Sequence, residues 1–214
     1  MALTLDISMS LDGFVAGPNA TLEEPLGRGG EQLHEWIVRL ASWRKHHGLE
    51  GGETTPDDEL TEEIFGSIGA HIMGRRMFSG GSGPWEQDPN ADGWWGDDPP
   101  FHHPVFILTH HPREPEAKQG GTTFTFVTEG IEAALAQARD AAGALDVGIA
   151  GGAETAQQYL RAGLVDTLHI HVAPVLLGGG TRLFDDASGG SISLQPVRSV
   201  QGDGVVHLTF TRSA

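Results

Sequence analysis

The stretch from Asp146 to Thr155, DVGIAGGAET, decides the fold, because a short apolar run meets a glycine pair and a helical pattern there. Glycine has no Cβ, so Gly151 and Gly152 let a ligand approach the backbone amides closely. The first turn of a helix leaves N–H groups unpaired and carries partial positive charge. The junction therefore predicts an anion site, and in a sheet protein the usual anion is a nucleotide pyrophosphate. Because a Gly-Gly pair also ends many strands for steric reasons, the site needs support from elsewhere in the chain.

Strand and helix patterns alternate along the rest of the sequence. Apolar runs or apolar–polar alternation predict strands at 3–9, 70–74, 105–109, 123–127, 146–150, 167–176 and 205–211. Helical spacing and capping residues predict helices at 31–47, 55–68, 130–142 and 153–163. This order indicates an α/β domain with a largely parallel sheet, and the final strands, which no helix connects, indicate an antiparallel edge or a C-terminal hairpin. We expect a single domain over residues 1–214, with inserted loops near 18–55 and 79–104.

Composition limits the class of protein and its partners. The 214 residues are 38% hydrophobic and 20% charged, which is typical of a globular domain with a buried core. No apolar run approaches the roughly 20 residues that span a bilayer, and no basic leader precedes an apolar segment. With no cysteine in the chain, these features predict a cytoplasmic protein that does not bind membranes. The net charge of −16 argues against nucleic acid as a partner but allows a small phosphorylated ligand held by a local pair of arginines.

Two more predicted strands end in residues that suit an anion. One ends in Met73-Gly74-Arg75-Arg76 and the other in Leu108-Thr109-His110-His111. Open α/β sheets bind ligands at the carboxyl ends of their parallel strands, and a guanidinium group bonds phosphate oxygens in pairs. Each segment alone also fits an ordinary turn. Together with the Gly151-Gly152 junction they predict a cradle for one dinucleotide.

Four motifs in this order resemble the dihydrofolate reductase-like family, in the branch that includes the reductase domain of the bifunctional riboflavin-biosynthesis protein. They are SMSLDGFVA at 8–16, IMGRRMF at 72–78, GIAGGA at 148–153 and APVLLGGG at 173–180. The resemblance covers nearly the whole chain except residues 18–55 and 79–104. It implies a dihydrofolate reductase-like three-layer α/β/α fold with a mixed, mostly parallel sheet of about eight strands.

The same resemblance implies NADP(H) as the cofactor and a homodimer. By position, the adenosine ribose and its 2′-phosphate would lie beside Gly74, Arg75, Arg76, Met77, Thr109, His110 and His111. The pyrophosphate would lie on Gly151, Gly152, Ala153, Glu154 and Thr155, and the nicotinamide would border Val15 and Ala16. Two arginines against one 2′-phosphate favour NADP(H) over NAD(H).

The leading interpretation is an NADPH-dependent reductase, similar to dihydrofolate reductase or to 5-amino-6-(5-phosphoribosylamino)uracil reductase. Its substrate would be a small pterin, pyrimidinone or carbonyl compound. Related reductases hold the substrate with an acid on the first helix, for which Asp12, Glu31 and Glu35 are the nearest candidates here. The proton would come from Asp12 or from bound water, although an Asp-Gly pair more often forms only a turn. The alternative is a non-catalytic nucleotide- or pterin-binding module of the same fold.

The histidines and tryptophans offer further hypotheses. The adjacent pairs at 46–47, 102–103 and 110–111 diverge on a helix or strand, and only His169 and His171 share a strand face. No acid or third ligand lies close to them in sequence, so we expect no metal site. The loop at 79–104 carries three tryptophans and is long enough to be a lid, a binding loop or a disordered segment. Trp94 and Trp95 in it could cover a substrate or pack on a dimer partner.

Overall fold

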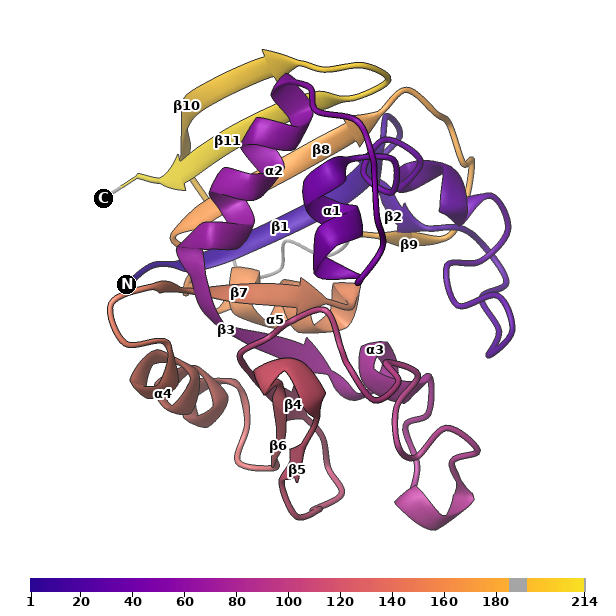
Figure 1. The fold of residues 1–214 in the computed structure, drawn as a ribbon, viewed down its shortest axis with the longest axis vertical. Helices are drawn as coiled ribbons and strands as arrows, with labels where there is room; N and C mark the ends of the chain where they lie inside the picture. Colours follow the sequence, from indigo (N-terminus) through magenta and orange to yellow (C-terminus); the bar gives the residue numbers. More distant parts are fainter. Residues whose placement is uncertain (185–191, 214) are drawn as a thin grey trace.

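The computed structural model describes residues 1–184 and 192–213, and within them nine strands form one mixed sheet (Figure 1). The spatial order of the strands is β10-β11-β8-β1-β7-β3-β4-β6-β5. Their bounds are β1 Leu3–Ser10, β3 Ile68–Gly74, β4 Pro104–Leu108, β5 Glu116–Ala117, β6 Thr123–Val127, β7 Asp146–Gly151, β8 Thr167–Ala173, β10 Leu194–Gln201 and β11 Val206–Arg212. Neighbours from β8 to β6 are parallel, whereas β11, β10 and β5 are antiparallel to their neighbours. A separate small sheet pairs β2 (Phe14–Ala16) with β9 (Thr181–Arg182).

Helices cover both faces of the large sheet, which confirms the expected three-layer α/β/α arrangement (Figure 1). The helices are α1 Ala41–His46, α2 Pro56–Ser67, α3 Arg75–Ser79, α4 Ile131–Ala142 and α5 Ala153–Arg161. Helices α4 and α5 pack on the face that carries the buried side chains of Leu5, Ile149 and Leu168. Helices α1 and α2 lie over the opposite face, in front of β1, β8 and β11 in Figure 1. None of the described helices is long and apolar enough to cross a membrane.

Local signals predicted most elements well. Helix α2 begins at Pro56, and Thr55 caps it by accepting a hydrogen bond from the Asp58 amide at 3.4 Å. The antiparallel edge expected at the end of the chain is confirmed, because β11 pairs antiparallel with β8, and this edge continues in a hairpin with β10. Five short or polar strands and helices were not predicted, namely β2, β5, β9, β10 and α3. The last of these matters for the site, because Arg75 and Arg76 begin a helix instead of a loop.

The predicted continuous helix over residues 31–47 is wrong. Only α1 and a short 3-10 turn at Gly30–Leu33 are helical there. Leu40 adopts an extended conformation, with ψ of 144°, and forms a β-bridge with Glu53. The Glu53 amide donates to the Arg39 carbonyl and the Ala41 amide donates to the Glu53 carbonyl, so strand-like pairing interrupts the helix. Trp36 and Leu40 are nevertheless buried.

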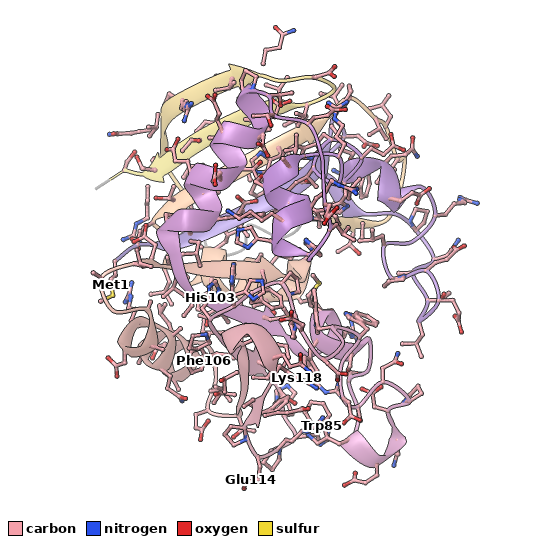
Figure 2. The ribbon with its side chains drawn as sticks, in the orientation of Figure 1. Met1, Trp85, His103, Phe106, Glu114 and Lys118 are labelled. Carbon is pink, nitrogen blue, oxygen red and sulfur yellow. The ribbon has the colours of Figure 1, made fainter. Side chains whose placement is uncertain are left out.

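The loop between α3 and β4 is fastened to the sheet by its tryptophans. The Trp85 indole N–H donates to the His111 carbonyl at 2.9 Å, and its ring meets Phe126 edge-on at 5.0 Å. The Trp94 indole N–H donates to the Met77 carbonyl at 3.0 Å. Figure 2 shows Trp85 at the same end of the molecule as Glu114 and Lys118, well away from His103. These contacts hold the loop in an ordered arrangement, and its role as a lid or a binding loop stays a prediction.

Candidate active site

The predicted strand ends do meet at one edge of the sheet. Strands β7, β3 and β4 are adjacent and parallel, with Ile72 level with Ile149 and Gly74 level with Leu108. The glycine junction after β7, the arginines after β3 and Thr109 after β4 therefore share the carboxyl edge. This is the edge at which open α/β sheets bind ligands.

The glycine junction leaves its backbone open to a ligand. Helix α5 begins at Ala153, and a Cβ placed on Gly152 would meet no atom of the described residues within 4 Å. A Cβ on Gly151 would come only as near as 3.9 Å to the Met77 sulfur. The predicted ligand Thr155 differs, because it is buried and its Oγ1 would lie 2.4 Å from a Cβ on Gly74. Thr155 therefore packs against Gly74, and its hydroxyl faces the strand instead of the open junction.

The two arginines do not form the expected pair for one phosphate. Only 6% of the Arg75 side chain is exposed, its Nη2 lies 2.5 Å from Asp88 Oδ2, and its guanidinium carbon is 3.6 Å from the centre of the Trp85 ring. Arg76 is exposed, and its Nη1 lies 2.9 Å from Glu154 Oε1. Because successive residues on a helix point in different directions, α3 buries one guanidinium and leaves the other at the surface. Arg76 is thus the one of the two that a phosphate can reach.

The partner of Arg75 is held in its charged form. Burial alone would raise the pKa of Asp88, but hydrogen bonds from Ser79 Oγ, the Asn90 amide and Arg75 together lower it. Ser79 Oγ donates to Asp88 Oδ2 at 2.7 Å and the Asn90 amide donates to Oδ1 at 2.9 Å. This buried carboxylate therefore fixes Arg75, the start of the loop and its Trp85 in one arrangement.

The candidate proton donor Asp12 is a structural anion. Its carboxylate accepts hydrogen bonds from Ser10 Oγ at 2.6 Å, the Leu177 amide at 3.1 Å and the Gly178 amide at 2.8 Å. The bond from Ser10 is the main cause of its lowered pKa. A carboxylate that three donors hold in its ionised form has no proton to give. Its bonds to the Leu177 and Gly178 amides tie the β1–β2 turn to residues 177–178. Val15 and Ala16 follow on β2, and both are half-buried.

Two acids that the sequence did not single out are buried on α2. Asp58 Oδ1 accepts a hydrogen bond from the Ser42 amide at 2.7 Å. Asp57 Oδ1 lies 3.1 Å from His207 Nε2, and its Oδ2 accepts from the Asp203 amide at 3.0 Å. Glu31 and Glu35 are exposed. Acids directly after Pro56 are typical of a helix start. The burial of Asp57 and Asp58 depends on contacts with residues far away in the sequence, which the local pattern does not report.

The Asp57 contact is one end of a buried polar chain. His171 Nδ1 lies 2.7 Å from His207 Nδ1, and His171 Nε2 lies 3.1 Å from Asp6 Oδ1. Trp36 covers both imidazoles, with ring centres 4.8 and 4.9 Å away. No acid lies close to His171 in the sequence. The neighbouring strands bring two partners to it, because β1 places Asp6 level with His169 and β11 places His207 level with His171. Among the described residues no group of three or more side chains is arranged to hold a metal.

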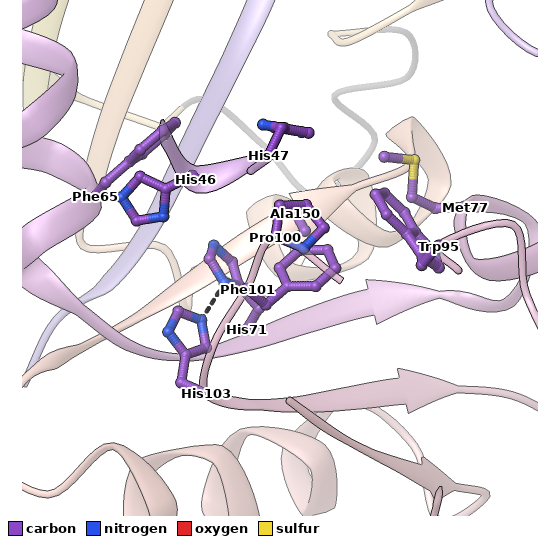
Figure 3. A pocket seen from close by; sticks show the side chains of 10 residues that line it. All are labelled: His46, His47, Phe65, His71, Met77, Trp95, Pro100, Phe101, His103 and Ala150. Atoms are coloured by element: carbon purple, nitrogen blue, oxygen red, sulfur yellow. Dashed lines mark hydrogen bonds between the residues drawn. The ribbon is translucent and has the colours of Figure 1, made fainter. Parts of the chain in front are cut away.

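A cavity of about 200 Å³ lies beside the glycine junction, on the face that α1 and α2 cover (Figure 3). It is lined by His46, His47, Phe65, His71, Met77, Trp95, Pro100, Phe101, His103 and Ala150. At its floor His71 Nδ1 lies 2.6 Å from His103 Nε2. Trp95 and Met77 stand at the opposite end from His46 and Phe65 in the figure. The position of Ala150, directly before Gly151, joins this cavity to the candidate anion site.

The imidazoles at the floor make stability depend on pH. Burial, with His103 close by, lowers the pKa of His71 to about 3, and burial also lowers the pKa of His103 to about 4. Below about pH 6.5 the unfolded histidines bind protons that the folded ones refuse, so their contribution is complete above that pH and is lost towards pH 4. We expect the free energy of unfolding to fall by about 2–4 kcal/mol between about pH 7 and about pH 5. Urea denaturation across this range measures it, and His71→Phe should flatten the dependence; an unchanged slope would contradict it.

Comparisons with known proteins find one matching family model and several solved structures with a similar fold. A family model described as the RibD C-terminal domain matches residues 1–208. No curated protein matches the chain. A putative riboflavin biosynthesis protein from Shewanella sp. PV-4 is 22% identical, with a TM-score of 0.63 and full coverage of both chains.

Two further solved structures share the fold. The diaminohydroxyphosphoribosylaminopyrimidine deaminase/5-amino-6-(5-phosphoribosylamino)uracil reductase of Thermotoga maritima is 13% identical with a TM-score of 0.57, and the match covers 99% of this chain and 56% of that one. Dihydrofolate reductase from Enterococcus faecalis, solved with NADP(H), is 15% identical with a TM-score of 0.54, over 100% and 97% of the two chains.

Proposed function

Because the chain belongs to the RibD C-terminal domain family, we propose that it is an NADP(H)-dependent reductase that passes a hydride to a small substrate. The observation that carries the proposal is the open glycine junction, which meets Arg76 and Thr109 at one sheet edge and adjoins a cavity. Such an edge suits a phosphate-bearing cofactor, and the cavity suits the compound that it reduces. Pterins, pyrimidinones and carbonyl compounds are the substrate classes we propose.

The residues of the junction fit the phosphates of such a cofactor. The amides of Gly152, Ala153 and Glu154 stand at the start of α5, where the helix dipole favours an anion. We propose that they hold the pyrophosphate and that Arg76 leaves Glu154 to bind the 2′-phosphate, near Thr109 and the two histidines that follow it. Arg75 supports the site from behind through Asp88 and Trp85.

The reducing end would lie between β2 and the cavity. When bound, the cofactor supplies the hydride; the chain orients the two reactants and excludes water. Val15 and Ala16 would border the nicotinamide, and Ala150 lies where the junction and the cavity meet. Since Asp12 is fixed as an anion by three donors, we propose that the proton comes from bound water.

Fluorescence titration tests the cofactor. NADPH should quench tryptophan emission with a dissociation constant at least about tenfold below that of NADH, because the 2′-phosphate gains a charged partner. Oxidation of NADPH would then be followed with pterins, pyrimidinones and carbonyl compounds. Failure of NADPH to bind below millimolar concentration would remove the proposal, and binding without turnover of any compound would favour the non-catalytic module.

The assembly and the compartment stay predictions. We propose a homodimer in the cytoplasm, on the resemblance to the family alone. Light scattering of the purified chain measures its mass in solution, and a mass of about 23 kDa, that of one 22.7 kDa chain, would contradict the dimer.

A further inference from the structure

Trp36 separates a surface pocket from a pair of buried imidazoles. On its outer side is a cavity of about 240 Å³ whose lining includes Arg39 and Asp203. On its inner side are the rings of His171 and His207, with centres 4.8 and 4.9 Å from that of the indole. The two histidines are only 3% and 2% exposed, and neither lines the pocket. One indole ring therefore stands between the pocket and both imidazoles.

The segment that carries Trp36, residues 34–40, is lightly attached to the fold. It follows the 3-10 turn and precedes α1, and it consists of turns and a single β-bridge. The Trp36 indole N–H donates to Ser8 Oγ at 3.0 Å, and Arg39 Nη2 lies 3.1 Å from Asp203 Oδ2. Because Asp203 is 79% exposed, this ion pair contributes little. The segment is thus held mainly by the burial of its indole on the two imidazoles.

The contact between the two imidazoles can hold one proton but not two. His171 Nδ1 and His207 Nδ1 are 2.7 Å apart, on residues that face each other directly across the β8–β11 pair. At this distance one nitrogen must donate and the other must accept. Each Nε2 lies 3.1 Å from an aspartate oxygen, so neither ring can turn over without losing that contact. A proton on both Nδ1 atoms would place two N–H groups and two positive rings against each other.

Carboxylates and guanidinium groups surround the pair and keep their charge between about pH 7 and about pH 5. They are Asp6 on β1, Asp57 and Glu63 on α2, Asp203 in the β10–β11 turn, Glu35 and Arg39 on segment 34–40, and Arg198 on β10. Two more histidines lie near Asp6. Burial lowers the pKa of His71 to about 3, and burial also lowers the pKa of His169, which bonds to Thr209 and not to the pair.

From this geometry we propose that Trp36 and the two imidazoles form an acid-operated latch on segment 34–40. While the Nδ1–Nδ1 contact holds one proton, the indole stays packed over both rings. A second proton makes the contact repulsive, and Trp36 then moves out with its segment so that water reaches the rings. The surface pocket thereby extends to the sheet at β8 and β11. This opening is separate from the proposed reduction and needs neither cofactor nor substrate.

The sign and size of the effect follow from where the second proton binds. Burial, with His171 close by, lowers the pKa of His207 in the closed arrangement, whereas a hydrated imidazole has an ordinary pKa of about 6.5. The open arrangement therefore takes up a proton below about pH 6.5 that the closed one refuses. The closed arrangement is favoured fully above that pH. The open fraction should rise about ten- to thirtyfold between about pH 7 and about pH 5.

Hydrogen exchange of the Trp36 indole N–H measures the opening in the full chain. In the two-dimensional NMR spectrum of isotope-labelled protein, the indole signal missing from Trp36→Phe identifies it. Its protection, relative to free tryptophan at the same pH, should fall about ten- to thirtyfold between about pH 7 and about pH 5. Low concentrations of urea should leave it unchanged, because a local opening exposes little surface. Constant protection, or protection that falls with urea as global unfolding does, would overturn the proposal.

Two variants of the same kind identify the titrating group. His207→Asn keeps an uncharged amide beside His171, which can accept or donate in either protonation state of that ring. The dependence of the Trp36 protection on pH should therefore disappear. His169→Asn removes the neighbouring half-buried histidine and should leave the dependence intact. A dependence that persists in His207→Asn, or is lost in His169→Asn, would contradict the latch. If His207→Asn does not fold, the pH and urea dependence of the wild type still decide.

Discussion

Replacing Asp88 with alanine is expected to lower the free energy of unfolding by about 3–5 kcal/mol. The substitution leaves the Arg75 guanidinium buried without the carboxylate of Asp88, while two of its nitrogens, Nε and Nη1, already have no hydrogen-bond partner among the described residues. It also removes the acceptor for Ser79 Oγ and the Asn90 amide. Urea denaturation followed by circular dichroism measures the loss.

Two comparisons show whether the buried charge is the cause. Asp92 lies in the same loop as Asp88, and its carboxylate is 85% exposed and paired with Arg113. Asp92→Ala should therefore lower the free energy of unfolding by less than about 1 kcal/mol. The double variant Arg75→Met, Asp88→Leu replaces both charges with apolar groups and should recover most of the stability. If Asp88→Ala costs no more than Asp92→Ala, the pair does not hold the loop in the way described.

The second large effect is expected at Arg76, on which cofactor discrimination would rest. Arg76→Gln should weaken NADPH binding by about ten- to a hundredfold and leave NADH binding nearly unchanged, because only the 2′-phosphate would use the guanidinium. Arg76 is 63% exposed, so the substitution should not disturb folding. Fluorescence titration with NADPH and with NADH gives, for each cofactor, the ratio of the dissociation constants of the variant and the wild type.

Glu154 provides a test in the opposite direction. Its carboxylate pairs with Arg76 in the free protein and would stand beside the incoming phosphates. Glu154→Gln should therefore tighten NADPH binding by a few fold, through loss of both competition and repulsion. Arg161→Gln, an exposed substitution at the far end of α5, should change the binding of neither NADPH nor NADH. Equal losses of NADPH and NADH in Arg76→Gln would show that Arg76 does not contact the 2′-phosphate.

The parts of the fold that local patterns encode could be predicted from the sequence. The glycine junction and the Thr55–Pro56 helix start each depend on a few neighbouring residues, and the alternation at 205–211 predicted β11, but no local pattern predicted its partner β10. The helix expected at 31–47 failed because Leu40 pairs with Glu53, a contact that helical periodicity does not report.

The site was predicted less completely for the same reason. The order of strands brought the three candidate anion-binding ends together as expected. Adjacency in sequence made Arg75 and Arg76 look equivalent, yet the start of α3 turns one of them inward to Asp88. The cavity histidines come from the end of α1 and the residue after it, from β3 and from the residue before β4, so their proximity follows only from the assembled sheet.

The series Asp6, His171, His207 and Asp57 also determines how many hydrogen ions this sheet face must retain. Three contacts join the four side chains, and each requires one proton. Carboxylates contribute none and two neutral imidazoles contribute two, so three contacts need one proton more than the neutral rings have. With all three contacts made as hydrogen bonds, the four groups beneath Trp36 carry one net negative charge in place of two.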